Sequence, residues 1–298
     1  MPGPCTAPLD ATTVAHLQQW CGRGETWHDQ LHAAPLRGLS ATLDRDDPLP
    51  APGSALPPLG HWLYFLPTAR QSELGADGHP RRGGFLPPVP LPRRMWAGGR
   101  LAWQAANPLR MGQQVERLST IRSIEHKAGR SGELLFVRVE HQYHNARGLA
   151  LTEEQDIVYR SAARPGDPAP PSQTPPQAGR QAWSRTIVPD DVLLFRYSAL
   201  TFNGHRIHYD RRYVTEVEGY PGLIVHGPLI ATLLLDLLRR ALPQAQVAAF
   251  DFRAVRPTFD LHPFSVHGKP AADGRTVALW AQDHEGLLTM QGTATLAQ

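Results

Sequence analysis

A proline-rich segment, residues 161–180, constrains the fold of this chain more than any other feature. It reads SAARPGDPAPPSQTPPQAGR and contains six prolines. Such a tract cannot form a helix or a central strand, and it behaves as a semi-rigid extended spacer. We therefore expect two domains, residues 1–160 and 181–298, joined by this linker. The 298 residues are enough for two units of ordinary size.

The two halves carry similar patterns near their ends. In the first half, GELLFVRVEHQYHNARGLALTEEQDIVYR predicts strands at residues 134–143 and 149–159. In the second half, DGRTVALWAQDHEGLLTMQGTATL predicts strands at residues 276–281 and 287–296. Each half has the same order of features: a Gly-Arg pair, a run of strand formers, a polar turn closed by glycine, and a final strand. The shared order suggests a duplicated unit.

The second half also contains a buried helix. Residues 223–238, LIVHGPLIATLLLDLL, are apolar on nearly every side and are followed by two arginines, which suit a helix C-terminus. Strands are expected at residues 250–255, where apolar and polar residues alternate, and at residues 264–268. A buried helix followed by antiparallel strands predicts an α+β fold. In the first half, residues 10–20 and 92–106 are both candidates for the corresponding helix.

Composition and charge exclude several classes of protein. The net charge is only +3 and the basic residues are scattered, whereas nucleic-acid-binding proteins cluster them on one face. The apolar window 223–238 is interrupted by His, Gly, Pro and Asp, so we expect no membrane span. The N-terminus does not read as a secretory signal. Cys5 and Cys21 make no disulfide framework. We expect a cytoplasmic protein without nucleic-acid or membrane partners.

The densest cluster of functional side chains is RYSALTFNGHRIHYD, residues 196–210, placed between an expected strand at residues 192–195 and the buried helix. It is too polar for a core strand, and long connections at the edge of a scaffold often carry function. His205 and His208 form an HxxH pair that could suggest zinc. No third ligand lies at metal spacing and no Glu accompanies the pair as in HExxH, so we expect no metal.

The stretch Asn203-Gly-His-Arg-Ile-His208 resembles the hydratase signature of MaoC-like (R)-specific enoyl-CoA hydratases. The longer strings YSALTFNGHRIHYD and GYPGLIVHGPLIATLLLDLL are similar to the branch that contains type-2 hydroxyacyl-thioester dehydratases and the itaconyl-CoA and mesaconyl-C4-CoA hydratases. FLPPVPLPRRMWAGG is similar to the N-terminal dehydratase-like domain of that branch. The resemblance covers about residues 10–298. It implies a double hot-dog fold, two antiparallel sheets each wrapped around a long helix, with a non-catalytic first half and a catalytic second half.

The resemblance implies a hydro-lyase that adds or removes water across the double bond of an enoyl-CoA thioester, with itaconyl-CoA or mesaconyl-C4-CoA hydrated to citramalyl-CoA. His208 would be the general base, because its ordinary pKa suits proton transfer near neutral pH. Asn203 stands where many members carry Asp. It cannot act as a base and would orient the water by hydrogen bonds. The Gly227 N–H, at the start of the buried helix, would stabilise the enolate oxygen. No cofactor is expected.

Substrate contacts and rival functions remain open at this point. Arg206 is the first candidate to pair with a free carboxylate on the acyl group, and Arg93 and Arg94 are the next. Tyr197 is a candidate substrate contact or a packing residue. The alternative functions are a 3-hydroxyacyl-ACP or -CoA dehydratase of fatty-acid metabolism, an acyl-CoA thioesterase on the same fold, and a non-catalytic acyl-binding module. The expected partners are an acyl-CoA thioester and a second copy of the chain in a homodimer.

Overall fold

The chain is described here from a computed structural model that covers residues 9–129, 132–161, 173, 175 and 182–297. Its first-half strands are β1 (Gly24–Gln30), β2 (Arg93–Trp103), β3 (Gln114–Gly129), β4 (Gly132–Asn145) and β5 (Gly148–Arg160). Its second-half strands are β6 (Trp183–Ile187), β7 (Val247–Ala254), β8 (Phe264–Pro270), β9 (Thr276–Gln282) and β10 (Leu288–Leu296). The expected linker falls almost entirely outside the described residues.

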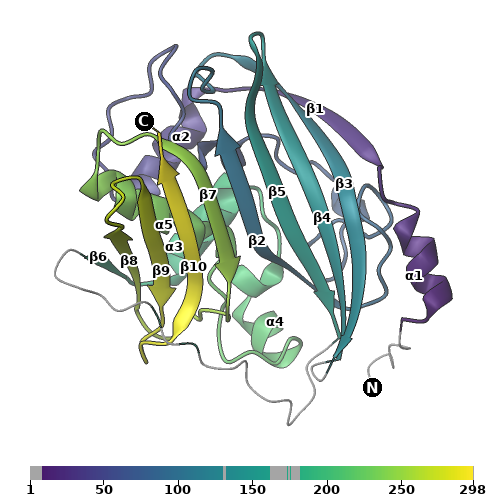
Figure 1. Ribbon diagram of the computed structural model, residues 1–298. Coiled ribbons are helices and arrows are strands. Elements are labelled where there is room, and N and C mark those ends of the chain that lie inside the picture. The colour runs from purple at the N-terminus through teal and green to yellow at the C-terminus, as the bar shows by residue number, and fades with distance from the viewer. Residues whose placement is uncertain (1–8, 130–131, 162–172, 174, 176–181, 298) are drawn as a thin grey trace.

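The ten strands of the described residues form one antiparallel sheet in the order β1-β3-β4-β5-β2-β7-β10-β9-β8-β6. The order is symmetric about the β2–β7 pair, so β5 corresponds to β10 and β4 to β9. This symmetry agrees with a duplicated unit. The predicted hairpins are confirmed as β4–β5 and β9–β10. Figure 1 shows the first-half strands, from purple β1 to teal β5, beside the green to yellow strands β7 to β10 of the second half.

Glycines let the two halves join at the β2–β7 pair, where Gly98 lies opposite Arg253. A Cβ atom on Gly98 would lie 2.6 Å from the carbonyl oxygen of Phe252, and one on Gly99 would lie 3.0 Å from the Phe252 ring. Contacts below 3.0 Å do not occur for real side chains. The close packing of this junction therefore requires the Gly-Gly pair of the MWAGG string.

The helices and single turns are α1 (Ala11–Gln18), α2 (Ala33–Thr42), η1 (Gly60–Leu63), η2 (Gln71–Glu73), α3 (Asp191–Leu200), η3 (Arg206–His208), α4 (Arg211–Glu216) and α5 (Gly227–Ala241). The predicted buried helix is confirmed as α5, which is buried from Leu229 to Leu238. It begins at Gly227 because Pro228 supports a helix start, while the preceding Ile224 pairs with Phe259 in extended conformation. None of the described helices is long and apolar enough to cross a membrane.

Both helix candidates for the first half need correction. Residues 92–106 contain strand β2, whose glycines and tryptophans suit a sheet junction. Residues 10–20 contain α1, but this helix has only eight residues and lies at the outer edge of the sheet against β3 (Figure 1). The first-half helix that shares the main core with α5 is the ten-residue α2. The first half therefore has a shorter helix than the second.

The strand expected at residues 192–195 is also wrong, because this stretch opens helix α3. The Asp190 carboxylate accepts a hydrogen bond from the Leu193 N–H at 2.8 Å and caps the helix. Val192 and Phe195 are both 62% exposed, whereas Leu194 and Tyr197 are buried. The residues of VLLF therefore alternate between an exposed and a buried face of a helix. Their strand-like composition does not reveal this pattern.

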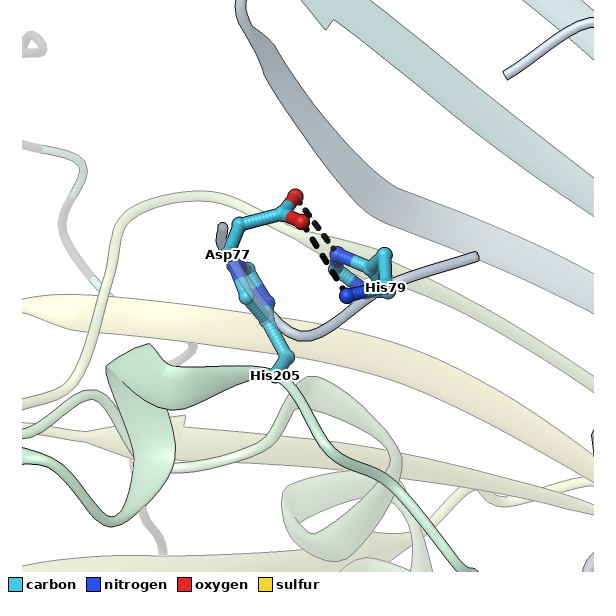
Figure 2. A group of neighbouring side chains, drawn as sticks. All are labelled: Asp77, His79 and His205. Atoms are coloured by element: carbon cyan, nitrogen blue, oxygen red, sulfur yellow. Dashed lines mark hydrogen bonds and ion pairs between the residues drawn. The ribbon is translucent and has the colours of Figure 1, made fainter. Parts of the chain in front are cut away.

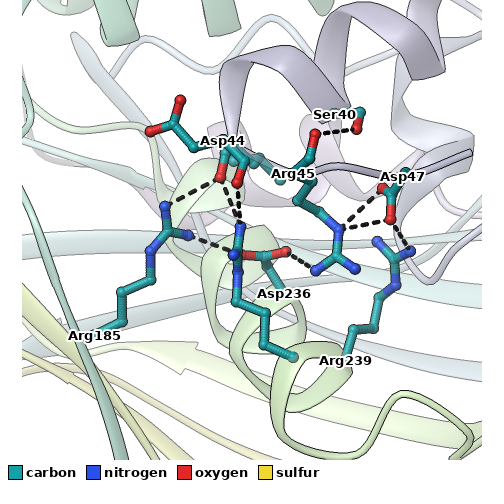
Figure 3. A network of polar contacts seen from close by, with 9 residues as sticks. Ser40, Asp44, Arg45, Asp47, Arg185, Asp236 and Arg239 are labelled. Atoms are coloured by element: carbon teal, nitrogen blue, oxygen red, sulfur yellow. Dashed lines mark hydrogen bonds and ion pairs between the residues drawn. The ribbon is translucent and has the colours of Figure 1, made fainter.

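A buried carboxylate ties the two halves together at the C-terminal end of α5 (Figure 3). The Asp236 side chain is 1% exposed and accepts hydrogen bonds from Arg45 at 2.7 Å, Arg185 at 2.8 Å and Arg240 at 2.8 Å. Arg45 follows α2 in the first half, while Arg185 lies on β6. Breaking a buried pair of this kind by removing one partner typically costs about 3–5 kcal/mol. This network therefore helps to hold α2 and α5 in one core.

Candidate active site

The connection from α3 to α4 positions the predicted site residues. After α3, Phe202 adopts a left-handed conformation, with φ of 48°, and the Asn203 N–H donates to the Ser198 carbonyl at 2.8 Å. The Asn203 side-chain oxygen then accepts from the His205 N–H at 3.0 Å. This local turn leads directly into η3, which ends at His208. The sequence TFNGHRIH thus folds into a helix stop, a turn and a single helical turn.

His208 is buried beneath this connection and has a defined tautomer. Its Nδ1 lies 2.7 Å from the carbonyl oxygen of Ile224. Since a carbonyl only accepts hydrogen bonds, Nδ1 carries the proton, which leaves the lone pair on Nε2. Burial lowers the pKa of His208 from 6.5 to about 4, against the opposing effect of the Ile224 hydrogen bond. The ring is therefore neutral near pH 7 and can accept a proton through Nε2.

His226 stacks on His208 and caps the start of α5. The two ring centroids are 3.7 Å apart with an angle of 17° between the planes. His226 Nε2 lies 2.8 Å from the Ser198 hydroxyl, and burial lowers its pKa well below 6.5. The next residue, Gly227, gives α5 its first N–H, and the first N–H groups of a helix have no partner within the helix. The stacked pair thus places the His208 ring beside the positive end of α5.

Tyr197 lies on the packing side of this pair. Its ring meets the His226 ring edge-on at 5.1 Å, and its hydroxyl lies 3.5 Å from the Thr232 hydroxyl on α5. Burial raises the pKa of the Tyr197 phenol. The structure therefore brings Tyr197 next to the site through His226.

The first half supplies a loop that closes over the connection. In this loop, residues 74–80, the backbone carbonyl of Asp77 accepts from the Arg206 N–H at 2.9 Å. Gly78 has a φ of +87°, and a Cβ atom there would lie 1.8 Å from the Gly204 carbonyl oxygen. Only glycine fits so close an approach. The sequence alone does not mark this loop, because it lies in the other half and has no motif of its own.

This loop brings two titratable side chains next to His205 (Figure 2). The Asp77 carboxylate lies 3.0 Å from His79 Nδ1, and the His79 and His205 ring centroids are 4.0 Å apart. His205 also meets His208 edge-on at 5.4 Å. Burial lowers the pKa of His205 to about 2, and the neighbouring His79 and His208 act in the same direction. A continuous row of imidazoles thus extends from the first-half loop to α5.

The group Asp77, His79 and His205 also has donor atoms that lie within 4.8 Å of one another. His205 of the HxxH pair therefore has Asp77 and His79 as neighbours in space, which no local sequence pattern could reveal. However, Asp77 and His79 already satisfy each other by a hydrogen bond, which a metal ion would have to displace. The absence of a metal stays a prediction.

The three candidate arginines differ in their surroundings. The Arg206 guanidinium donates to the Asp210 carboxylate at 2.7 and 3.0 Å and to the Ala76 carbonyl at 3.0 Å. Arg93 donates to the Glu218 carbonyl at 2.6 Å and stacks over the ring of Tyr220. Each of these two guanidiniums thus has protein partners.

Arg94 is different. It is half-buried on β2 opposite the buried Tyr159, and within the described part of the chain no carboxylate lies within ion-pair distance of it. Its positive charge lowers the pKa of both His79 and His205, although burial is the larger cause for each. Among the described residues, Arg94 therefore has no carboxylate partner. Its guanidinium interacts with the Tyr159 phenol, and its charge acts on the imidazole row.

A buried carboxylate in the first half is, in contrast, fully engaged. Glu153 is completely buried and accepts hydrogen bonds from His61 at 3.0 Å, Trp62 at 2.9 Å and Tyr143 at 2.9 Å. Burial alone would raise its pKa, but His61 and the other neighbours lower it to about 2. With its lone pairs occupied, Glu153 is a structural anchor of the first-half core.

Comparison with known proteins shows the family of the chain. A family model described as hydroxyacyl-thioester dehydratase type 2 matches residues 59–260, about two thirds of the chain and including the whole α3–α5 region. The chain belongs to this family. It is therefore a hydro-lyase, as the motif around His208 predicted.

Two relatives illustrate the range of the family. A mesaconyl-C(4)-CoA hydratase of Chloroflexus aurantiacus is 48% identical over 282 residues, which cover 95% of this chain and 98% of that protein. The mitochondrial hydroxyacyl-thioester dehydratase type 2 of Schizosaccharomyces pombe is 29% identical over 269 residues, covering 80% of this chain and 87% of that protein. The branch expected from the sequence is thus confirmed.

Solved structures confirm the fold. A MaoC-like dehydratase superposes with a TM-score of 0.69 at 15% identity and covers 94% of this chain and 99% of its own. A Mycobacterium tuberculosis protein with a double hotdog fold has a TM-score of 0.57 at 14% identity, with 93% and 96% coverage. The ten-stranded sheet is therefore a double hot dog whose two halves share one continuous sheet.

Proposed function

We propose that this chain hydrates the double bond of mesaconyl-C4-CoA to form citramalyl-CoA through a single site centred on His208. The relative that is 48% identical over almost the whole chain carries that activity in its name. The observation that carries the proposal is the buried His208 ring, whose Nδ1–H is held by the Ile224 carbonyl so that Nε2 is free to act as a base.

The reaction follows from these groups. His208 Nε2 removes a proton from water as the water oxygen bonds to the β carbon of the enoyl thioester. The electrons of the double bond move onto the thioester carbonyl, and the Gly227 N–H at the start of α5 stabilises the enolate oxygen. The imidazolium then returns its proton to the α carbon, which restores the carbonyl and the neutral His208. Water is consumed and no other reactant is needed.

Asn203 and the first half have supporting roles in this proposal. Asn203 holds the turn before η3 through its side-chain oxygen and turns its amide group to the attacking water. The first half supplies the acyl pocket and the loop that closes over Gly204. Residues 1–160 then form the non-catalytic hot dog and residues 181–298 the catalytic one. The active assembly is a homodimer in the cytoplasm, a reducing compartment that suits the exposed free thiol of Cys21.

A second candidate is the reverse reaction on a different acyl chain. The Schizosaccharomyces pombe relative is named as a hydroxyacyl-thioester dehydratase, and the same base and oxyanion donor would remove water from a 3-hydroxyacyl thioester of CoA or acyl-carrier protein. The higher identity to the hydratase over a larger share of the chain favours mesaconyl-C4-CoA.

The test is to incubate the purified protein with mesaconyl-C4-CoA and follow two signals together. We expect the absorbance of the conjugated enoyl thioester to fall and the product to gain the mass of one water, with no release of free thiol. Succinyl-CoA is the matched control, because it has the same charges but no double bond. Free thiol from either substrate would identify a thioesterase. Turnover confined to straight-chain 3-hydroxyacyl thioesters would favour the dehydratase.

A further inference from the structure

The proposed substrate carries a free carboxylate that needs a partner in the protein. In mesaconyl-C4-CoA the free carboxylate is attached to the same carbon that receives the water. When the substrate is bound, this carboxylate must therefore lie within a few bond lengths of the water that His208 Nε2 deprotonates. Leaving it unpaired in a closed pocket would be strongly unfavourable, and arginine is the side chain that best matches its geometry. A binding group for it must therefore lie close to the His208 ring.

Two of the basic groups in this region are already occupied. Arg206 fastens the first-half loop by donating to Asp210 and to the Ala76 carbonyl, and its guanidinium stacks over the Tyr213 ring at 4.1 Å. Arg82 donates to the carbonyls of Val89, Leu91 and Pro92. These guanidiniums hold the protein together, and recruiting either of them for a ligand would break those contacts.

Arg94 lies on the strand that reaches the start of α5. Two residues further along β2, the Trp96 carbonyl oxygen lies 3.9 Å from the position of a Cβ atom on Gly227. Alternate residues of a strand point to the same face, so Arg94 and Trp96 share the face that carries the core. The opposite residue Tyr159 is completely buried on this face. Arg94 thus lies on the buried face of the sheet, where its charge acts on His79 and His205.

The imidazole row forms the rest of the surroundings. Burial is the main cause that lowers the pKa of both His79 and His205, so both rings are neutral near pH 7. His79 and His208 lower the pKa of His205 further, Arg94 lowers both values and Arg82 lowers that of His79, while the Asp77 carboxylate opposes these effects. Two guanidinium charges thus act on His79, and one acts on His205, against the Asp77 carboxylate. This region holds two guanidiniums, and Arg94 has no carboxylate partner among the described residues. Together with neutral imidazoles next to the catalytic ring, these charges suit it to receive an anion.

We propose that Arg94, together with the imidazoles of His79 and His205, binds the free carboxylate of a dicarboxylic enoyl-CoA during its hydration at His208. This inference rests on the proposed function and deepens it. It selects Arg94 from the three arginines considered from the sequence, and it makes a strand and a loop of the first half part of the substrate site. The specificity of the enzyme for a carboxylated acyl group would then depend on the first half and its chemistry on the second.

The test compares two substrates in two variants. Mesaconyl-C4-CoA and crotonyl-CoA both carry the CoA phosphates, but only the first has an acyl carboxylate. We expect Arg94→Leu to lower kcat/KM for mesaconyl-C4-CoA by about 10- to 100-fold, the loss of charge-assisted hydrogen bonds, and to change that for crotonyl-CoA by less than about threefold. Arg206→Leu is the matched control, since loosening the loop should lower both substrates by similar factors.

Equal losses on both substrates in Arg94→Leu would show that Arg94 binds the CoA phosphates or supports the fold, and would overturn the inference. So would unchanged turnover of mesaconyl-C4-CoA. Two controls exclude a misfolded variant. Arg94→Lys keeps the charge and should recover part of the loss. Binding of succinyl-CoA and butyryl-CoA, which do not react, measures the effect of the acyl carboxylate on affinity directly. If the wild type hydrates crotonyl-CoA but not mesaconyl-C4-CoA, the inference fails while the hydro-lyase chemistry stands. If it hydrates neither, the proposed function fails first.

Discussion

The pH dependence of hydration should reveal how deeply the catalytic imidazole is buried. Burial of His208 lowers its pKa from 6.5 to about 4. A base must be unprotonated to act, so activity is lost only as the pH falls through that value. At about pH 5, such a group is roughly 90% unprotonated, whereas an ordinary histidine is only about 3% unprotonated. We therefore expect kcat/KM at about pH 5 to lie within about twofold of its value at pH 7, instead of falling about 25-fold.

The assay should use crotonyl-CoA, because mesaconyl-C4-CoA has a carboxylate that titrates in the same range. Acid unfolding is the main confounding process. The pKa values of His141, His205 and His208 are all below 6.5 in the folded state, so the unfolded state binds protons first and stability decreases as the pH falls below about 6.5. Samples held at low pH and returned to pH 7 should recover full activity. A reversible loss of kcat/KM centred between about pH 6 and 7 would refute a deeply buried base.

Two further substitutions test the site and its support. Asn203→Ala should reduce kcat strongly, because the turn loses the oxygen that accepts a hydrogen bond from the His205 N–H. Asn203→Asp keeps that oxygen and should retain substantial turnover. Equal losses of kcat in the two variants would point to a role for the amide NH₂. Asp236→Ala should lower the free energy of unfolding, measured by urea titration, by about 3 kcal/mol. This value is near the lower end for a broken buried pair, because Arg45 and Arg185 keep other partners. A loss below about 1 kcal/mol would show that the network contributes little to stability.

Much of the fold could be predicted from local patterns. The hairpins β4–β5 and β9–β10 and the helix α5 each have a strong signal within a single stretch of sequence. The errors arose where tertiary contacts decide the structure. Residues 92–106 have no clear periodicity, and they form a strand because Gly98 and Gly99 allow β2 to pack against β7. The run VLLF has strand formers, but the Asp190 cap makes it the first turn of α3.

The site shows the same division. His208, Asn203 and Gly227 could be selected because they belong to one continuous motif. Asp77 and His79 lie in the other half, within a short turn whose only sequence signal is a pair of glycines. Their contact with His205 depends on how the two hot dogs pack together, which no local pattern contains. The ranking of the arginines likewise required the structure. The pairing of Arg206 with Asp210, and the lack of a carboxylate partner for Arg94 among the described residues, are properties of three-dimensional surroundings.

Replacement of His208 tests the central claim most directly. The measurement is kcat for hydration of mesaconyl-C4-CoA by His208→Ala and by His208→Gln, which better preserves volume, with thermal unfolding recorded for both. We predict that kcat falls by about 10²–10⁴, the range for loss of a general base, while the unfolding temperature changes little. Activity of either well-folded variant within tenfold of the wild type would contradict the assignment of His208 as the base.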